Sequence, residues 1–206
     1  MSSTPQSAQD DLAFLRSLVG AADGVQRSFG ETYLAAGLCY GAQFVLSAAQ
    51  MQAWLPGDAS WSLAIGFVPT AIFLLLLVWF LWRGRQAAPT GVVGRAITAA
   101  FAWIGVANLA LIVVIGSVAL RQHSITTWLI YPCVVYVLQG VAWMVAFALR
   151  RRAWLGLVAA GWFIAGVVMA LCVQSLSDYI LAAGVGMLLC MVVPGAVMVR
   201  LARTRA

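Results

Sequence analysis

Residues 28–55 read SFGETYLAAGLCYGAQFVLSAAQMQAWL, and the rest of the chain is interpreted from this stretch. It is long and apolar enough for a helix that crosses a bilayer, which takes about 20 residues. A polar stripe follows it at helical spacing and comprises Tyr33, Ala36, Tyr40, Gln43, Ser47 and Gln50. An unpaired amide in hydrocarbon costs roughly 2–7 kcal/mol. We therefore expect the stripe to face other helices or water rather than lipid.

The composition of the whole chain is that of a helical integral membrane protein. Its 206 residues are 64% hydrophobic and 9% charged, and its mean hydropathy is +0.97. Soluble domains carry about 25% charged residues, so a water-soluble fold is excluded. The net charge of +6 comes from twelve Arg without any Lys, and no nucleic-acid-binding module accompanies it. We expect the lipid bilayer, and no nucleic acid, as a partner of this chain.

Five further apolar segments follow the first, each near or above the length of a membrane span. They lie at 61–82, 96–120, 126–149, 153–174 and 178–200. The connections between them are short, so consecutive helices are expected to be antiparallel neighbours. The predicted fold is an all-α integral membrane protein, in which residues 28–206 form a bundle of six transmembrane helices arranged as three antiparallel hairpins.

The first 27 residues are predicted to form a separate cytoplasmic segment. An amphipathic helix is expected at 5–19, with Gly20 as its stop signal. Ser28 and Glu31 have the spacing of a capping box, which predicts that the first span begins there. Because the short helix carries a slightly negative charge, a partner protein or the chain's own loops are favoured over acidic lipid as its contact.

The arginines predict the orientation in the membrane. Eleven of the twelve fall on one side of the predicted spans, against Arg121 alone on the other. Loops rich in Arg stay in the cytoplasm. The lack of Lys is interpreted as the codon bias of a GC-rich genome. Together these features predict a multi-pass protein of a bacterial inner membrane with both termini in the cytoplasm.

Small residues four positions apart allow helix backbones to approach closely. The chain has Gly37-x-x-x-Gly41, Gly156-x-x-x-Ala160 and Gly161-x-x-x-Ala165. Packing within one bundle is the favoured interpretation, and contact with a second protein or a second copy is the alternative. Pro194 interrupts the sixth segment, where a static kink is favoured and a hinge is the alternative.

A set of polar and aromatic side chains forms the candidate site. It comprises Tyr40, Gln43, Ser47, Trp103, Asn108, Tyr136, Gln139, Trp143 and Trp162. Among them, Tyr136, Gln139 and Trp143 share one helix face. A cavity with this lining suits a small neutral or amphipathic molecule. Interhelical hydrogen bonding, worth about 0.6 kcal/mol per contact, is the simpler interpretation and is favoured.

The sequence contains few residues that could form a catalytic or cofactor-binding site. No charged residue lies in the middle of a predicted span, which argues against coupling to an ion gradient. A catalytic or metal site could be assembled only at the outer rim, from Asp58, His123 and Asp178. Solvated loop residues that cap helices are the favoured interpretation of these three. We expect no catalytic residue, no metal and no cofactor.

The predicted function is therefore that of a non-enzymatic bacterial inner-membrane protein, a sensor, regulator or complex-assembly subunit. Its cytoplasmic partner face would comprise the N-terminal helix and the Arg-rich loops, and a homo-oligomer is a further possibility. The alternative is a small-molecule carrier or channel that uses the polar and aromatic cavity.

Overall fold

The computed structural model describes the backbone of residues 5–84 and 92–204, and the side chains of residues 5–26, 81 and 84 lie outside the description. The regular structure in the described ranges is helical. The elements are α1 (Pro5–Met51), α2 (Ala59–Gly84), α3 (Val92–Gln122), α4 (Ile125–Arg150), α5 (Ala153–Leu171), α6 (Leu176–Met187), the π-helical turn η1 (Leu188–Val192) and α7 (Val193–Arg203).

Six helices within the described ranges are long and apolar enough to cross a membrane. They are Arg27–Met51, Ala59–Phe80, Val92–Gln122, Ile125–Arg150, Ala153–Leu171 and Leu176–Arg203, the last of which contains α6, η1 and α7. Each of the six predicted segments overlaps one of these helices. The all-α architecture with six helices of spanning length is confirmed.

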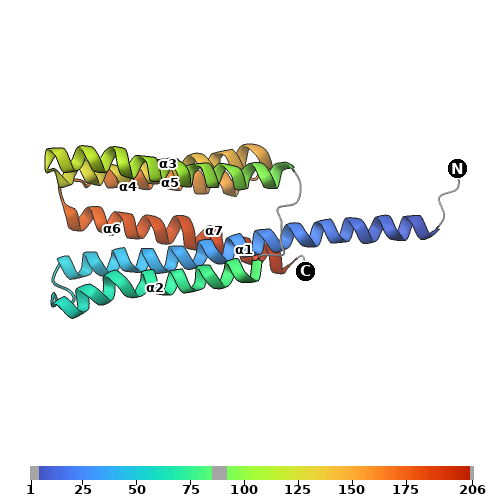
Figure 1. Ribbon diagram of the computed structural model, residues 1–206, viewed down its shortest axis with the longest axis horizontal. Coiled ribbons are helices and arrows are strands. Elements are labelled where there is room, and N and C mark those ends of the chain that lie inside the picture. The colour runs from blue at the N-terminus through green and yellow to red at the C-terminus, as the bar shows by residue number, and fades with distance from the viewer. Residues whose placement is uncertain (1–4, 85–91, 205–206) are drawn as a thin grey trace.

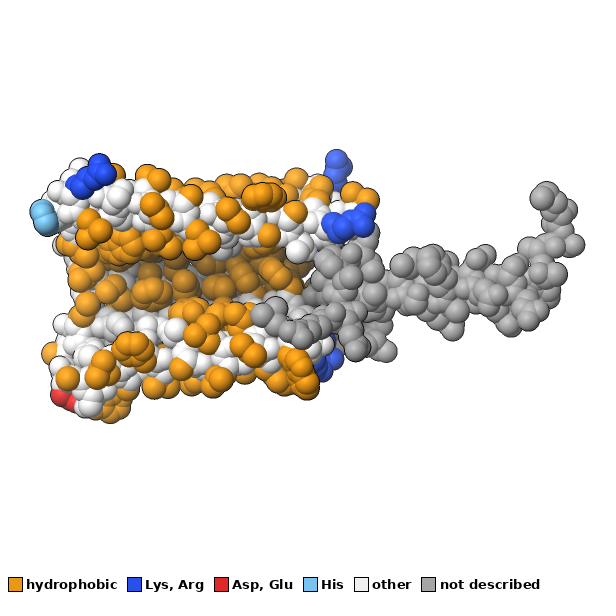
Figure 2. Space-filling view, viewed as in Figure 1, with side chains coloured by type: hydrophobic (Ala, Val, Ile, Leu, Met, Phe, Trp, Pro, Cys, Tyr) orange, Lys and Arg blue, Asp and Glu red, His pale blue; other side chains and the backbone are white. Residues whose placement is uncertain are grey.

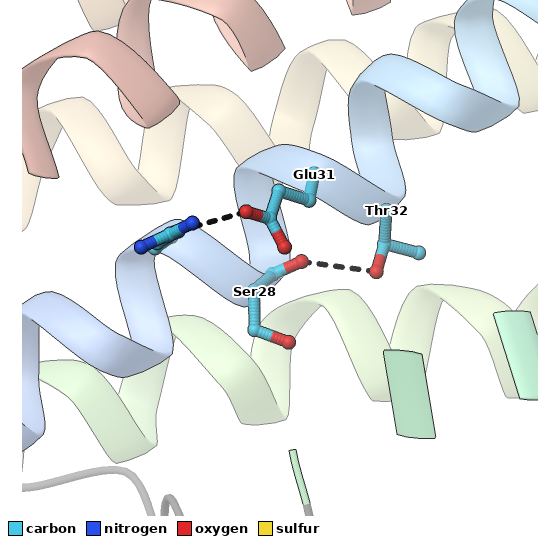
Figure 3. A network of polar contacts seen from close by, with 4 residues as sticks. Ser28, Glu31 and Thr32 are labelled. Carbon is cyan, nitrogen blue, oxygen red and sulfur yellow. Dashed lines mark hydrogen bonds and ion pairs between the residues drawn. The ribbon is translucent and has the colours of Figure 1, made fainter. Parts of the chain in front are cut away.

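Helix α1 runs without interruption through the predicted boundary between its two parts. The Glu31 carboxylate lies 2.8 Å from the Arg27 guanidinium, one turn back, and the Thr32 hydroxyl donates to the Ser28 carbonyl at 3.0 Å (Figure 3). Both contacts are internal to a continuous helix, so the predicted capping box and the stop at Gly20 are wrong. A single Gly costs a helix only about 1 kcal/mol, too little to stop one that no Pro interrupts.

The helices form two layers (Figure 1). One layer contains α3, α4 and α5, and the other contains α2, α1 and the sixth span. Contacts between α5 and α6 join the layers. Because α4 packs on α5 as extensively as it does on α3, the contacts do not single out three hairpins.

Glycines bring α1 and the sixth span into close contact. A Cβ atom at Gly37 would lie 2.6 Å from the Cβ of Met191, and one at Gly195 would lie 2.8 Å from the backbone nitrogen of Leu34. A distance below 3 Å leaves no room for the added carbon. The first small-residue pattern therefore serves packing within the bundle, as the favoured interpretation had it.

Candidate functional site

A buried hydrogen bond between two side chains joins α1 to α4. The Trp143 indole N–H donates to the Tyr33 hydroxyl at 2.8 Å, and the two side chains are 2% and 8% exposed. Their rings meet edge to face with centroids 5.4 Å apart, a favourable arrangement for an aromatic pair. The buried indole N–H of Trp162 on α5 has no hydrogen-bond partner among the described residues.

Further rings extend this contact into an aromatic cluster, which comprises Phe29, Tyr33, Phe101, Tyr136, Trp143, Trp154 and Trp162. Phe101 of α3 packs edge to face on Phe29 and on Trp143, with centroids 5.2 and 5.7 Å apart. Tyr136 and Trp162 meet at 4.9 Å. The cluster thus connects four helices, α1, α3, α4 and α5, and lies partly in the hydrophobic core.

Two tyrosine hydroxyls fix α6 to α4. Tyr136 donates to the Ala183 carbonyl at 2.6 Å, and Tyr179 donates to the Leu129 carbonyl at 2.7 Å. Both hydroxyls are buried, so each bond satisfies a group that would otherwise be costly to enclose.

The polar stripe of α1 turns toward α2 in its later part. The Gln43 amide donates to the Gly66 carbonyl at 2.9 Å and accepts from the Thr70 hydroxyl at 3.3 Å. The ring of Tyr40 packs on Phe73 with centroids 5.1 Å apart. The expectation that the stripe faces other helices is confirmed at these positions, and the Gln43 amide is taken up by helix pairing.

The nine predicted site residues are divided among several places. Tyr136, Trp143 and Trp162 belong to the aromatic cluster, whereas Tyr40 and Gln43 lie between α1 and α2. Ser47 is half-buried on α1. The structure thus brings three of the nine together in one cluster.

The remaining three predicted residues lie on α3 and α4. The side-chain amide oxygens of Asn108 and Gln139 are buried and have no hydrogen-bond partner in the described part of the chain. Trp103 is 71% exposed on α3, away from the other helices. The reason is its register: Phe101 packs inward, and a position two residues later points about 200° around the helix.

A hydrophobic recess separates the two layers on the face shown in Figure 2, and the basic side chains lie at the two ends of the bundle, mostly at the end opposite the histidine. At the histidine end, a shallow depression of about 440 Å³ lies between α3 and α4, with Gly116, His123 and Trp128 in its lining. The exposed surface of this depression is almost wholly apolar, although His123 and Ser124 belong to its lining.

The three residues of the predicted rim site act separately. Asp58 accepts hydrogen bonds from the Ser60 hydroxyl and from the Trp61 backbone N–H, as an N-cap of α2 does, and the Ser60 bond lowers the pKa of this carboxyl. Asp178 lies in the first turn of α6, where a helix favours negative charge. Within the described ranges, no three His, Cys, Asp or Glu residues gather as metal ligands would.

Sequence reasoning missed the central member of the aromatic cluster. Tyr33 begins the polar stripe, but it was not among the candidate residues, and its pairing with Trp143 joins positions 110 residues apart. The position of Tyr33 on the polar stripe was the sequence signal that could have placed it among the candidate residues.

Comparison of the chain with protein-family models, with curated proteins and with solved structures finds no match.

Proposed function

We propose that this chain is a non-enzymatic, multi-pass protein of a bacterial inner membrane, with both termini in the cytoplasm, that acts as a sensor, regulator or assembly subunit. The observation that carries this proposal is the continuity of α1 from Pro5 to Met51. Its N-terminal part extends well past the other helices, at the end where the C-terminus also lies (Figure 1).

This helix is placed to connect a partner with the bundle. Within the described part of the chain, α1 packs on α2 and on all three parts of the sixth span, α6, η1 and α7. It also reaches α4 through the bond between Tyr33 and Trp143. A partner that binds the extension would therefore act on a helix in contact with most of the bundle.

The positions of the arginines support the assignment of the partner face to the end of the bundle past which α1 extends. Arg150 is the last residue of α4, and Arg151 and Arg152 lie between α4 and α5. Arg200 and Arg203 lie in the last turn of α7. Inner-membrane loops rich in Arg remain in the cytoplasm. Reporter fusions at the C-terminus and in the loop at 121–124 test this orientation, and a cytoplasmic signal from the loop fusion would contradict it.

Truncation tests the partner face. A variant that lacks residues 2–20 and the full chain are cross-linked in cells of the host, purified and compared by mass spectrometry, with His123→Ala as the control at the opposite end. We expect the truncation to lose the cross-linked partner while its thermal unfolding stays within a few degrees of the full chain. Retention of every partner by the truncated chain would contradict the proposal.

The alternative function is a small-molecule carrier, and one observation favours it. The enclosed amide oxygens of Asn108 and Gln139 have no hydrogen-bond partner, unlike the amide of Gln43. A thermal-shift screen with neutral and amphipathic compounds tests this function. A compound that stabilises the wild type and the Gln43→Leu variant, but not the Asn108→Leu/Gln139→Leu double variant, would support a carrier.

A further inference from the structure

The sixth span changes its helix type halfway along. Helix α6 ends at Met187, η1 continues as a π-helical turn from Leu188 to Val192, and α7 begins with Pro194 at its second residue. A π-helical turn pairs each N–H with the carbonyl five residues back, and such turns are frequent at functional sites. Pro removes one further backbone donor. The α-helical hydrogen-bond pattern of the span is therefore interrupted at 188–194.

The part of the span before η1 packs on α1 and α5, and two tyrosine hydrogen bonds also tie it to α4. The hydroxyl of Tyr136 bonds to the Ala183 carbonyl, and the hydroxyl of Tyr179 bonds to the Leu129 carbonyl. A Cβ at Gly186 would lie 3.0 Å from the Tyr136 ring and from the Ala165 side chain, so this stretch of α6 packs tightly on both neighbours.

The part of the span after η1 is held by α1. A Cβ at Gly195 would lie within 3.0 Å of backbone atoms of Leu34 and Gly30, and one at Gly30 would lie 2.9 Å from the Cβ of Met198. Within the described ranges, α7 makes its extensive contacts with α1 and η1 and not with α4 or α5. Helix α1 thus packs along the whole sixth span, and the π-helical turn stands where the contacts of this span with α4 and α5 end.

We propose that η1 is a joint, at which α7 and the inner part of α1 shift as one unit against α4, α5 and α6. Gly184 of α6 packs on Phe44 and Val45 of α1, and Gly41 of α1 packs on Leu188 at the start of η1. These glycine surfaces suit the small sliding of packed helices. The hydrogen bond between Tyr33 and Trp143 is the latch, because it ties the moving helix to the fixed layer.

The joint does not depend on the partner proposed above, because it is a property of the isolated chain. Its test uses the full chain in lipid nanodiscs without a partner. Spin labels are attached through a genetically encoded ketone-bearing residue, so that the four native cysteines stay in place. One label pair crosses the joint, from Arg200 on α7 to Leu157 on α5. The reference pair lies on one side of it, from Val185 on α6 to Ile164 on α5, and all four positions are exposed.

Pulsed electron–electron double resonance then measures the distribution of distances between the two spin labels of each pair. We expect the pair across the joint to give a distribution at least about twofold broader than the reference, or two separate distances. Tyr33→Phe removes the latch and should increase the second population. Deletion of Leu189, which is 61% exposed, returns the turn to α-helical spacing and should narrow the distribution to that of the reference.

Two outcomes decide the proposal even if the deletion variant fails to fold. Broadening or a second distance in the wild type that grows in Tyr33→Phe supports the joint. Equally narrow distributions for both pairs, in the wild type and in Tyr33→Phe, would show a fixed kink and overturn it.

Discussion

The contact between α7 and α1 gives the sharpest test of the packing, through the substitution Gly195→Ala. The added Cβ would lie 2.8 Å from the nitrogen and 2.9 Å from the Cα of Leu34, and 3.0 Å from the Gly30 carbonyl oxygen. All three are backbone atoms, so no side chain can rotate away. Overpacking of this kind costs about 1–3 kcal/mol, and the rigid neighbours favour the upper part of that range.

Helix propensity complicates the measurement, because Ala is favoured over Gly in a helix by about 1 kcal/mol. Gly105→Ala is the matched control. Gly105 also lies inside a helix, but its added Cβ would have no atom within 4 Å. Both variants gain the same propensity, so the difference between their unfolding free energies isolates the clash. We expect Gly195→Ala to be less stable than Gly105→Ala by about 1–3 kcal/mol.

Reversible unfolding in mixed micelles, followed by the fluorescence of the nine tryptophans, measures this difference. A second control, Gly66→Ala on α2, also has open space around the added carbon and should behave as Gly105→Ala does. If Gly195→Ala were as stable as both controls, α1 and α7 would not be in the close contact described here, and the joint at η1 would lose its moving unit.

Three further substitutions test individual contacts. Tyr33→Phe leaves the buried Trp143 N–H without an acceptor and should cost about 1–3 kcal/mol of unfolding free energy, whereas an unchanged value would contradict the bond. Gln43→Leu removes the bond to the Gly66 carbonyl, and a loss near 0.6 kcal/mol, and not above about 1.7, is expected from the same unfolding measurement. Arg151 has φ 49°, so Arg151→Gly should raise the stability by about 1 kcal/mol, and a lower melting temperature would contradict this.

The spans could be predicted from the sequence because hydrophobic length is a local property. Every predicted segment overlaps a helix of the structure, and the breaks fall at polar or Pro- and Gly-containing loops such as 52–58. The boundary inside α1 could not be predicted in this way. The capping box at Ser28 and the Gly at position 20 are signals of about 1 kcal/mol each, and a continuing helix outweighed both.

The candidate site was harder to predict than the spans, because periodicity gives the face of a residue but not the helix that the face meets. Gln43 was correctly placed on an inward face, yet its partner Gly66 could not be named from spacing. Trp103 was included for its depth along the helix, which carries no information on direction. The η1 turn gave no sequence signal beyond Pro194, since π-helical geometry depends on the surrounding packing.

The hydrogen bonds between helices differ in kind from one helix pair to the next. This difference indicates which pairs of helices can shift relative to one another. The hydroxyls of Tyr136 and Tyr179 and the amide of Gln43 each bond to a backbone carbonyl of a neighbouring helix, which fixes those helix pairs. Between α1 and α4, in contrast, the contact depends on one side-chain pair, Tyr33 and Trp143. A single bond of this kind contributes only about 0.5–1.5 kcal/mol net, so it can hold one arrangement without excluding another. Motion that starts in α1 should therefore appear first at this pair and at η1, before any change between α4 and α6.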